Sequence, residues 1–90
     1  MTAEEHSTTV TVADPMGLHL RTGKDVVQLA NQFQAEITAQ NLTRTSPMVS
    51  LKSILEIMQL QARHGHDLLI RATGPDAQAA LDALCVLLGQ

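Results

Sequence analysis

The sequence contains almost no aromatic residues. It has no tryptophan and no tyrosine, and Phe33 is its one phenylalanine. Proteins that bind single-stranded nucleic acids stack the bases on aromatic side chains, and nucleic-acid binding usually also needs a basic face. This chain has a net charge of -3 at pH 7. We therefore expect no nucleic-acid partner.

Several other features are also missing. Cys85 is the one cysteine, so an internal disulfide is excluded. No apolar run reaches the roughly 20 residues that span a bilayer, and the acidic, polar segment 1–9 is unlike a secretory signal. His64 and His66 have no nearby cysteine or cluster of carboxylates, so the pair is a weak signal for a metal site. We expect a cytoplasmic protein with no membrane segment, no metal and no cofactor.

The chain has enough apolar residues for one small domain. It is 90 residues long and 44% of these residues are hydrophobic, which predicts a single domain over 1–90 with an aliphatic core. A domain of this kind is expected to be a monomer.

Hydrophobic periodicity predicts four strands and three helices. Alternation indicates strands over 8–13, 35–40, 49–51 and 67–73. Helical spacing indicates helices from about residue 20 to 33, over 53–60, and from "TGPD" (73–76) to residue 88. Each strand has one apolar face, which predicts a sheet that is covered on one side. These elements predict an open-faced two-layer sandwich of one sheet and three helices that cover it.

Two local signals define helix ends. Gly65 is expected to stop the second helix. Thr73 and Asp76 have the spacing of a capping box at the start of the third helix.

A histidine and an arginine lie where the first helix is predicted to begin, in "MGLHLRTGKD" (16–25). The first N–H groups of a helix lack helical partners and, with the axial dipole, favour an anion. Imidazole changes charge near neutral pH and can form covalent intermediates. The guanidinium of Arg21 could bind phosphoryl oxygens through charge-assisted hydrogen bonds. The junction therefore predicts a phosphoryl group carried on His19, whereas His6, His64 and His66 are expected to be ordinary surface residues.

Three collinear segments resemble the HPr family, the histidine-containing phosphocarriers of the bacterial sugar phosphotransferase system. "GLHLRTG" (17–23) resembles the family's active-site pattern G-[IL]-H-A-R-P-A. "VSLKSILEIMQL" (49–60) is similar to V-N-x-K-S-I-[ML]-G-[VL]-M-x-L, and "GHDLLIRATGPDAQAAL" (65–81) is similar to G-x-x-[VI]-x-[VI]-x-A-x-G-x-D-E-x-x-A-L. The predicted order of elements also agrees with the family's β-α-β-β-α-β-α order. The resemblance therefore implies the fold class α+β, with a four-stranded antiparallel sheet and three helices on one face.

The resemblance implies a phosphocarrier that does not turn over alone. His19 would be phosphorylated on Nδ1 by enzyme I, with phosphoenolpyruvate as the original donor, and Arg21 would neutralise the phosphoryl group. The helix start, comprising Leu20, Thr22 and Gly23, would stabilise that group. The recipient would be an enzyme II A domain or a paralogous acceptor. In some bacteria HPr kinase/phosphorylase modifies the serine that matches Ser53, which adds close to two negative charges.

The resemblance also implies a surface on which partners dock. The matching positions are Leu20, Leu51, Leu55 and Met58. A flexible methionine suits such a surface. For Leu51 and Met58 the alternative is that they face the core.

The sequence departs from the family pattern at the site. Thr22 replaces a proline, and Leu20 and Gly23 replace alanines. Thr22 and Asp25 have capping-box spacing, so the helix either begins one turn late with Thr22 as its cap or keeps His19 as the cap. Glu56 replaces a glycine and would place a like charge near a phosphorylated Ser53.

Two functions follow from these observations. The first is a phosphocarrier that uses His19. The alternative is a regulatory binding module of the same fold, controlled by Ser53 phosphorylation or by docking alone, with little or no carrier activity.

Overall fold

The computed structural model describes residues 4–89. Its elements follow the order β1 (Glu5–Thr11), α1 (Leu20–Ala30), β2 (Glu36–Asn41), β3 (Val49–Ser50), α2 (Ile54–Met58), β4 (Asp67–Thr73) and α3 (Ala77–Leu88). The predicted α+β order is confirmed. Within the described part of the chain, no helix is long and apolar enough to cross a membrane.

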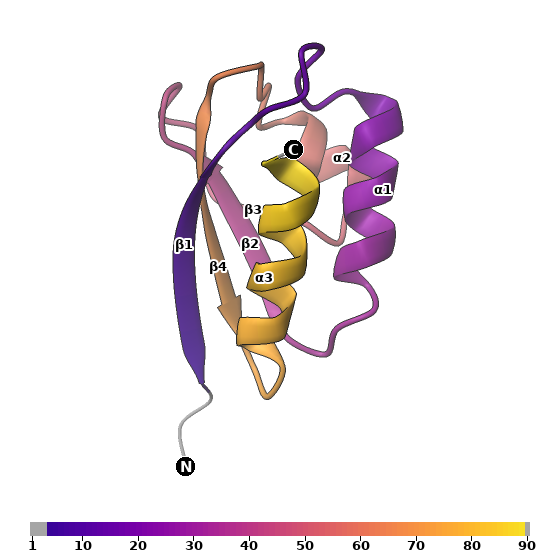
Figure 1. Ribbon diagram of the computed structural model, residues 1–90, viewed down its shortest axis with the longest axis vertical. Coiled ribbons are helices and arrows are strands. Elements are labelled where there is room, and N and C mark those ends of the chain that lie inside the picture. Colours follow the sequence, from indigo (N-terminus) through magenta and orange to yellow (C-terminus); the bar gives the residue numbers. More distant parts are fainter. Residues whose placement is uncertain (1–3, 90) are drawn as a thin grey trace.

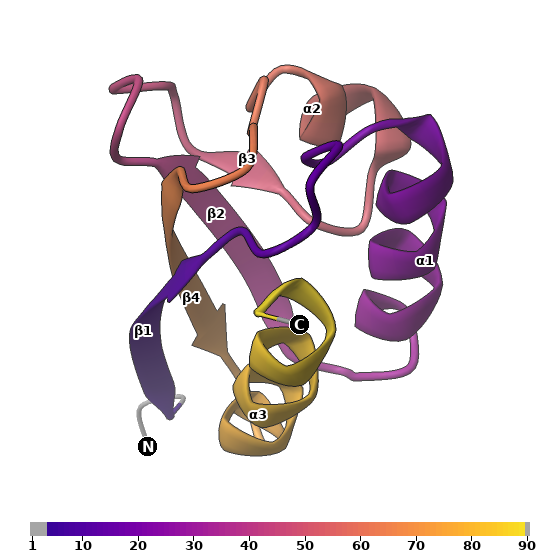
Figure 2. The same ribbon diagram turned by 45° about the horizontal axis from the view of Figure 1, so that its top comes forward.

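The four strands form one antiparallel sheet in the order β1-β4-β2-β3. The register of β1 with β4 runs from Glu5↔Thr73 to Thr11↔Asp67. Figure 1 shows the sheet as one layer, with all three helices on the same side of it. Figure 2 shows α3 over the sheet with α1 to one side of it, and α2 beside the end of α1 at which that helix begins. The predicted open-faced sandwich is therefore confirmed.

The core lies between these two layers and is aliphatic. The predicted inward-facing residues of β4 are all buried, and so are five apolar residues of α3: Ala77, Ala80, Leu81, Leu84 and Leu88. Each fully buried aliphatic side chain contributes about 1.5–3 kcal/mol relative to exposure. Alternation on the strands and a helical stripe on α3 place these residues against one another.

Both predicted helix-end signals are wrong. Helix α2 ends at Met58, and Gln61, with a φ of 48°, is the left-handed residue that follows it. Gly65 lies instead in the turn before β4. Helix α3 begins at Ala77 without a side-chain cap from Asp76. The Asp76 carboxylate accepts hydrogen bonds from the main-chain N–H groups of Gln34 and Ala35, both at 2.8 Å, so it ties α3 to the start of β2.

Among residues 4–89, Asn41 is the one buried polar residue, and it organises the end of β2. Its Nδ2 donates to the Leu60 carbonyl at 3.0 Å and lies 3.1 Å from His66 Nδ1. Its Oδ1 accepts from the N–H groups of Thr43 and Arg44. This side chain therefore joins the turn after β2 to the segment between α2 and β4.

Candidate functional site

The loop between β1 and α1 is held in place before it reaches His19. The N–H of Leu18 donates to the Ala62 carbonyl at 2.9 Å. Gly17, with a φ of 72°, precedes it. A Cβ at position 17 would lie 2.7 Å from the Ala62 carbonyl oxygen and 2.8 Å from Arg63 Cα. Only glycine lets the loop approach this backbone so closely, and that approach directs the next residues to the start of α1.

His19 is the N-cap of α1. Its backbone is extended, with φ -104° and ψ -176°, and the helix begins at Leu20. The structure therefore selects the His19 frame over the frame with Thr22 as the cap. His19 as a whole is half-buried and lines an open hollow, so solvent and a partner can reach it.

Thr22 is tied to His19 through its hydroxyl. The His19 N–H donates to Thr22 Oγ1 at 3.0 Å. The hydroxyl proton can go to the carbonyl of His19 at 3.1 Å or to that of Gly17 at 3.4 Å. The reciprocal approach, from the Thr22 N–H to the His19 ring, completes the arrangement of a capping box but is a looser contact than a full hydrogen bond. The capping pair is therefore His19 with Thr22, and not Thr22 with Asp25.

Gly23 does not belong to the set of free donors at the helix start, which corrects its predicted role. Its N–H donates to the His19 carbonyl at 2.7 Å and so forms the first helical hydrogen bond. A Cβ here would lie 2.9 Å from both Ile54 Cδ1 and Met58 Cε. Gly23 therefore serves the close packing of α1 on α2.

Two N–H groups at the start of α1 remain available. Within residues 4–89, no hydrogen bond uses the N–H of Leu20 or Arg21. Since they are the first two helical residues, they have no partner within the helix. The macrodipole adds partial positive charge at the same point. These donors lie beside the His19 side chain because His19 precedes them directly.

Arg21 and Lys24 bring positive charge to the site. The guanidinium of Arg21 is exposed, and none of the ion pairs among the described residues involves it. A shallow hollow of about 560 Å³ lies along this part of α1, and its lining residues are His19, Leu20, Arg21, Lys24, Asp25 and Gln28. The sequence analysis did not identify Gln28 as part of this site. Its position four residues after Lys24, on the same helix face, is the signal that could have found it.

The four predicted docking residues differ in how far the structure exposes them. Leu20 and Leu55 are 62% and 79% exposed, as a docking role requires. Leu51 is 1% exposed, so its predicted docking role is wrong: it is a core residue beneath the start of α2. Met58 packs partly against the core. Met16, which is 78% exposed in the loop before His19, is a large apolar side chain that the sequence analysis missed.

Ser53 is the N-cap of α2, and its hydroxyl has a structural use. Ser53 Oγ accepts the N–H of Glu56 at 3.3 Å. The Glu56 carboxylate in turn accepts the N–H of Ser50 at 3.1 Å. A phosphate on Ser53 would therefore meet a carboxylate that is already held nearby.

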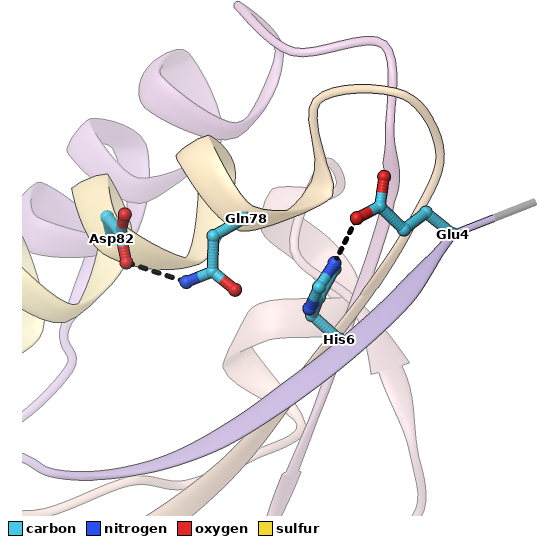
Figure 3. Close-up of polar contacts among 4 residues, drawn as sticks. All are labelled: Glu4, His6, Gln78 and Asp82. Carbon is cyan, nitrogen blue, oxygen red and sulfur yellow. Dashed lines mark hydrogen bonds and ion pairs between the residues drawn. The ribbon is translucent and has the colours of Figure 1, made fainter.

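The other histidines have different surroundings. His6 Nε2 lies 2.8 Å from Glu4 Oε1 at the start of β1, and Figure 3 shows this pair together with the Gln78–Asp82 hydrogen bond of α3. His66 Nδ1 accepts from the Arg63 N–H at 3.2 Å, and His64 is exposed. Among the described residues, no group of three or more His, Cys, Asp and Glu could hold a metal ion. Of the four histidines, only His19 caps a helix.

Comparisons with known proteins agree with this arrangement. A family model described as the PTS HPr component phosphorylation site matches residues 6–90. The phosphocarrier protein NPr of Shewanella violacea is 36% identical over 78 residues, which are 87% of this chain and 82% of that protein. The crystal structure of the phosphocarrier protein HPr from Bacillus anthracis superposes with a TM-score of 0.86 at 33% identity, covering 93% of this chain and 96% of that one.

Some relatives are much longer than this chain. The multiphosphoryl transfer protein of Vibrio cholerae is 38% identical over 84 residues, which are 93% of this chain but 21% of that protein. The family model, the NPr relative and the HPr structure all describe one class of protein, the phosphocarriers. The chain belongs to the HPr family of the phosphotransferase system.

Proposed function

We propose that this chain carries a phosphoryl group on His19. It takes the group from enzyme I, with phosphoenolpyruvate as the original donor, and passes it to a sugar-specific enzyme II A domain or a similar acceptor. Membership of the HPr family supports phosphotransfer in general. The observation that carries the assignment to a residue is the position of His19 as the N-cap of α1.

The chemistry requires a neutral imidazole with one free nitrogen lone pair. The capping geometry favours Nδ1, because this atom is as many bonds from Cα as the side-chain oxygen of an aspartate or asparagine N-cap. The Nδ1 lone pair attacks phosphorus while the bond from phosphorus to its donor atom on enzyme I breaks. The electron pair of that bond stays with the donor atom, and the Nε2 proton remains on the ring. Transfer to the next acceptor repeats this exchange, with His19 as the leaving group.

The start of α1 supplies the stabilising charge. The N–H groups of Leu20 and Arg21 have no partner among the described residues and can donate to phosphoryl oxygens. The helix dipole favours an anion there by up to about 2 kcal/mol. The exposed Arg21 guanidinium can add charge-assisted hydrogen bonds, which are about twice as strong as neutral ones. All three contributions act only when the phosphoryl group is present, so they stabilise the carried state.

Partner recognition is assigned to the exposed apolar residues around the site. Leu20 and Leu55, with the flexible Met58 between helices α1 and α2, would contact enzyme I and the acceptor in turn. Methionine can adapt its shape to more than one partner. This surface would bring each partner's reacting group to the His19 ring.

The test is intact-protein mass spectrometry after incubation with phosphoenolpyruvate and the cognate enzyme I. The expected result is one phosphoryl group that is labile in acid and stable in base. His19→Ala should take no label. His64→Ala is the matched control, because it removes an exposed histidine outside the site and should be labelled like the wild type. Absence of label on the wild type, or label on His19→Ala, contradicts the proposal.

The second candidate is a regulatory binding module, and the large exposed apolar side chains favour it. Leu55 at 79% exposure is more open than a leucine needs to be for folding. In this case a partner would bind through Leu20 and Leu55. Its activity would be regulated either by this docking alone or by phosphorylation of Ser53 by HPr kinase/phosphorylase. Leu55→Asp would then abolish partner binding while His19→Ala would leave it unchanged. In a carrier, His19→Ala abolishes labelling by enzyme I, and Leu55→Asp lowers it because enzyme I docks on the same surface. The effect of His19→Ala therefore separates the two functions.

A further inference from the structure

Thr22 makes contacts that the transfer chemistry above does not use. Its hydroxyl accepts the His19 N–H at 3.0 Å. The His19 carbonyl is held at the same time by the Gly23 N–H at 2.7 Å. Both main-chain polar groups of His19 are therefore fixed, one by the side chain of Thr22 and one by the helix. This fixes the direction in which the ring leaves the backbone.

The main-chain N–H of Thr22 is the third donor at the helix start. It faces the His19 ring in the capping box without forming a full hydrogen bond. A phosphoryl group on Nδ1 would occupy the space between the ring nitrogen and this N–H. An oxygen of that group is a much stronger acceptor than a neutral ring nitrogen, because it carries negative charge.

We propose that Thr22 is a positioning residue with two separable parts. Its hydroxyl orients His19 for attack, and its N–H changes partner from the ring nitrogen to a phosphoryl oxygen once the group is attached. This inference rests on the proposed function in one respect, that His19 carries the phosphoryl group. It does not depend on which protein donates the group.

The chain allows the two parts to be removed one at a time. Thr22→Ser keeps the hydroxyl and the N–H. Thr22→Val keeps the shape and the N–H but loses the hydroxyl. Thr22→Pro loses both, and proline is tolerated in the first turn of a helix, where the N–H has no helical partner. Circular dichroism and thermal unfolding check that each variant is folded.

Phosphoramidate serves as a donor that needs no partner protein. The His19 Nδ1 lone pair attacks its phosphorus, the P–N bond of phosphoramidate breaks, and ammonia leaves with the electron pair. Thr22→Ser should react at the wild-type rate. Thr22→Val should react roughly threefold to tenfold more slowly, as for the loss of one hydrogen bond. In Thr22→Pro the phosphohistidine should also hydrolyse roughly tenfold to a hundredfold faster, because a hydrogen bond to a charged group is lost.

Amide NMR of the wild type gives a readout that needs no variant. The Thr22 N–H signal should move downfield on phosphorylation, together with those of Leu20 and Arg21. An unmoved Thr22 signal, or equal phosphohistidine lifetimes in Thr22→Val and Thr22→Pro, overturns the role of the N–H. Equal reaction rates in Thr22→Val and the wild type overturn the role of the hydroxyl. Labelling by phosphoramidate but not by enzyme I would instead refute the proposed function and leave the Thr22 comparison valid.

Discussion

Gly17→Ala should destabilise the protein far more than an ordinary surface substitution. Gly17 has a φ of 72°, where an L-residue with a side chain is strained. Its Cβ would also lie 2.7 Å from the Ala62 carbonyl oxygen and 2.8 Å from Arg63 Cα. These are backbone atoms, which cannot rotate away as the end of a side chain can. The loop must therefore move, and the hydrogen bond from Leu18 to Ala62 must lengthen.

Two effects add up in this variant. The left-handed conformation costs an alanine about 1–2 kcal/mol. Forcing an extra methyl group into a packed site costs about 1–3 kcal/mol more. The expected total loss is about 2–5 kcal/mol. This is a large part of the free energy of unfolding of a small domain, which is about 5–15 kcal/mol. His19 follows two residues later, so phosphorylation should slow as well.

Gly65→Ala is the matched control for this prediction. Gly65 also has a positive φ, 86°, but no atom lies within 4 Å of its Cβ position. This variant should show the conformational cost alone. Urea unfolding followed by circular dichroism measures both free energies, and a difference of about 2 kcal/mol corresponds to about 8–16 °C in Tm. Equal destabilisation of the two variants would refute the reasoning, because it would mean that the approach to residues 62 and 63 is not close.

Three further predictions concern the core, the helix contact and pH. Leu51→Ala should lower the free energy of unfolding by about 2–5 kcal/mol, whereas Leu55→Ala should change it by less than about 0.5 kcal/mol in the same urea titration; equal losses would contradict the assignment of Leu51 to the core. Gly23→Ala should leave the stability measured by thermal unfolding almost unchanged, because the helix gains about 1 kcal/mol while the ends of two flexible side chains, Ile54 and Met58, must shift. A loss of stability as large as that of Gly17→Ala would show that this contact is rigid. Hydrogen bonds from the main-chain N–H of Gln34, then from that of Ala35, lower the pKa of the Asp76 carboxyl. The contribution of the Asp76 carboxylate to stability is therefore complete above the usual aspartate pKa and is lost as the pH falls below it. In urea unfolding, Asp76→Asn should be less stable than the wild type at pH 7. The difference in the free energy of unfolding should shrink as the pH is lowered through the acid range.

Periodicity was enough to predict the fold of this chain. Alternating residues placed Leu68, Ile70 and Ala72 on the inner face of β4, and all three are buried. These patterns are strong because one side of each element faces a continuous aliphatic core. Helix ends were harder to predict because they depend on contacts with other segments. Asp76 has the spacing of a cap, but it binds N–H groups at the start of β2 instead.

The site shows the same division. The sequence placed His19 and Arg21 at a helix start, and the structure puts His19 at the cap. It could not decide whether Leu51 faced the core or the docking surface, because an apolar residue suits either place, whereas Leu55 was expected to be exposed. Leu51 is buried because the chain folds over the sheet at this point, and this contact is visible only in the tertiary structure. Gly23 was expected to help stabilise the phosphoryl group, whereas it provides room for Ile54 and Met58.

The link from Leu18 to Ala62 has a consequence for how the protein becomes active. It joins two segments that meet only after β1, α1, β2 and α2 have come together. Bringing such distant segments into contact carries a loop-closure entropy that only the assembled domain offsets. A nascent chain or a short peptide around His19 would contain the reacting ring without its orientation. The ability to accept a phosphoryl group should therefore appear late in folding. A newly synthesised chain should not react with its phosphoryl donors until the whole domain has folded.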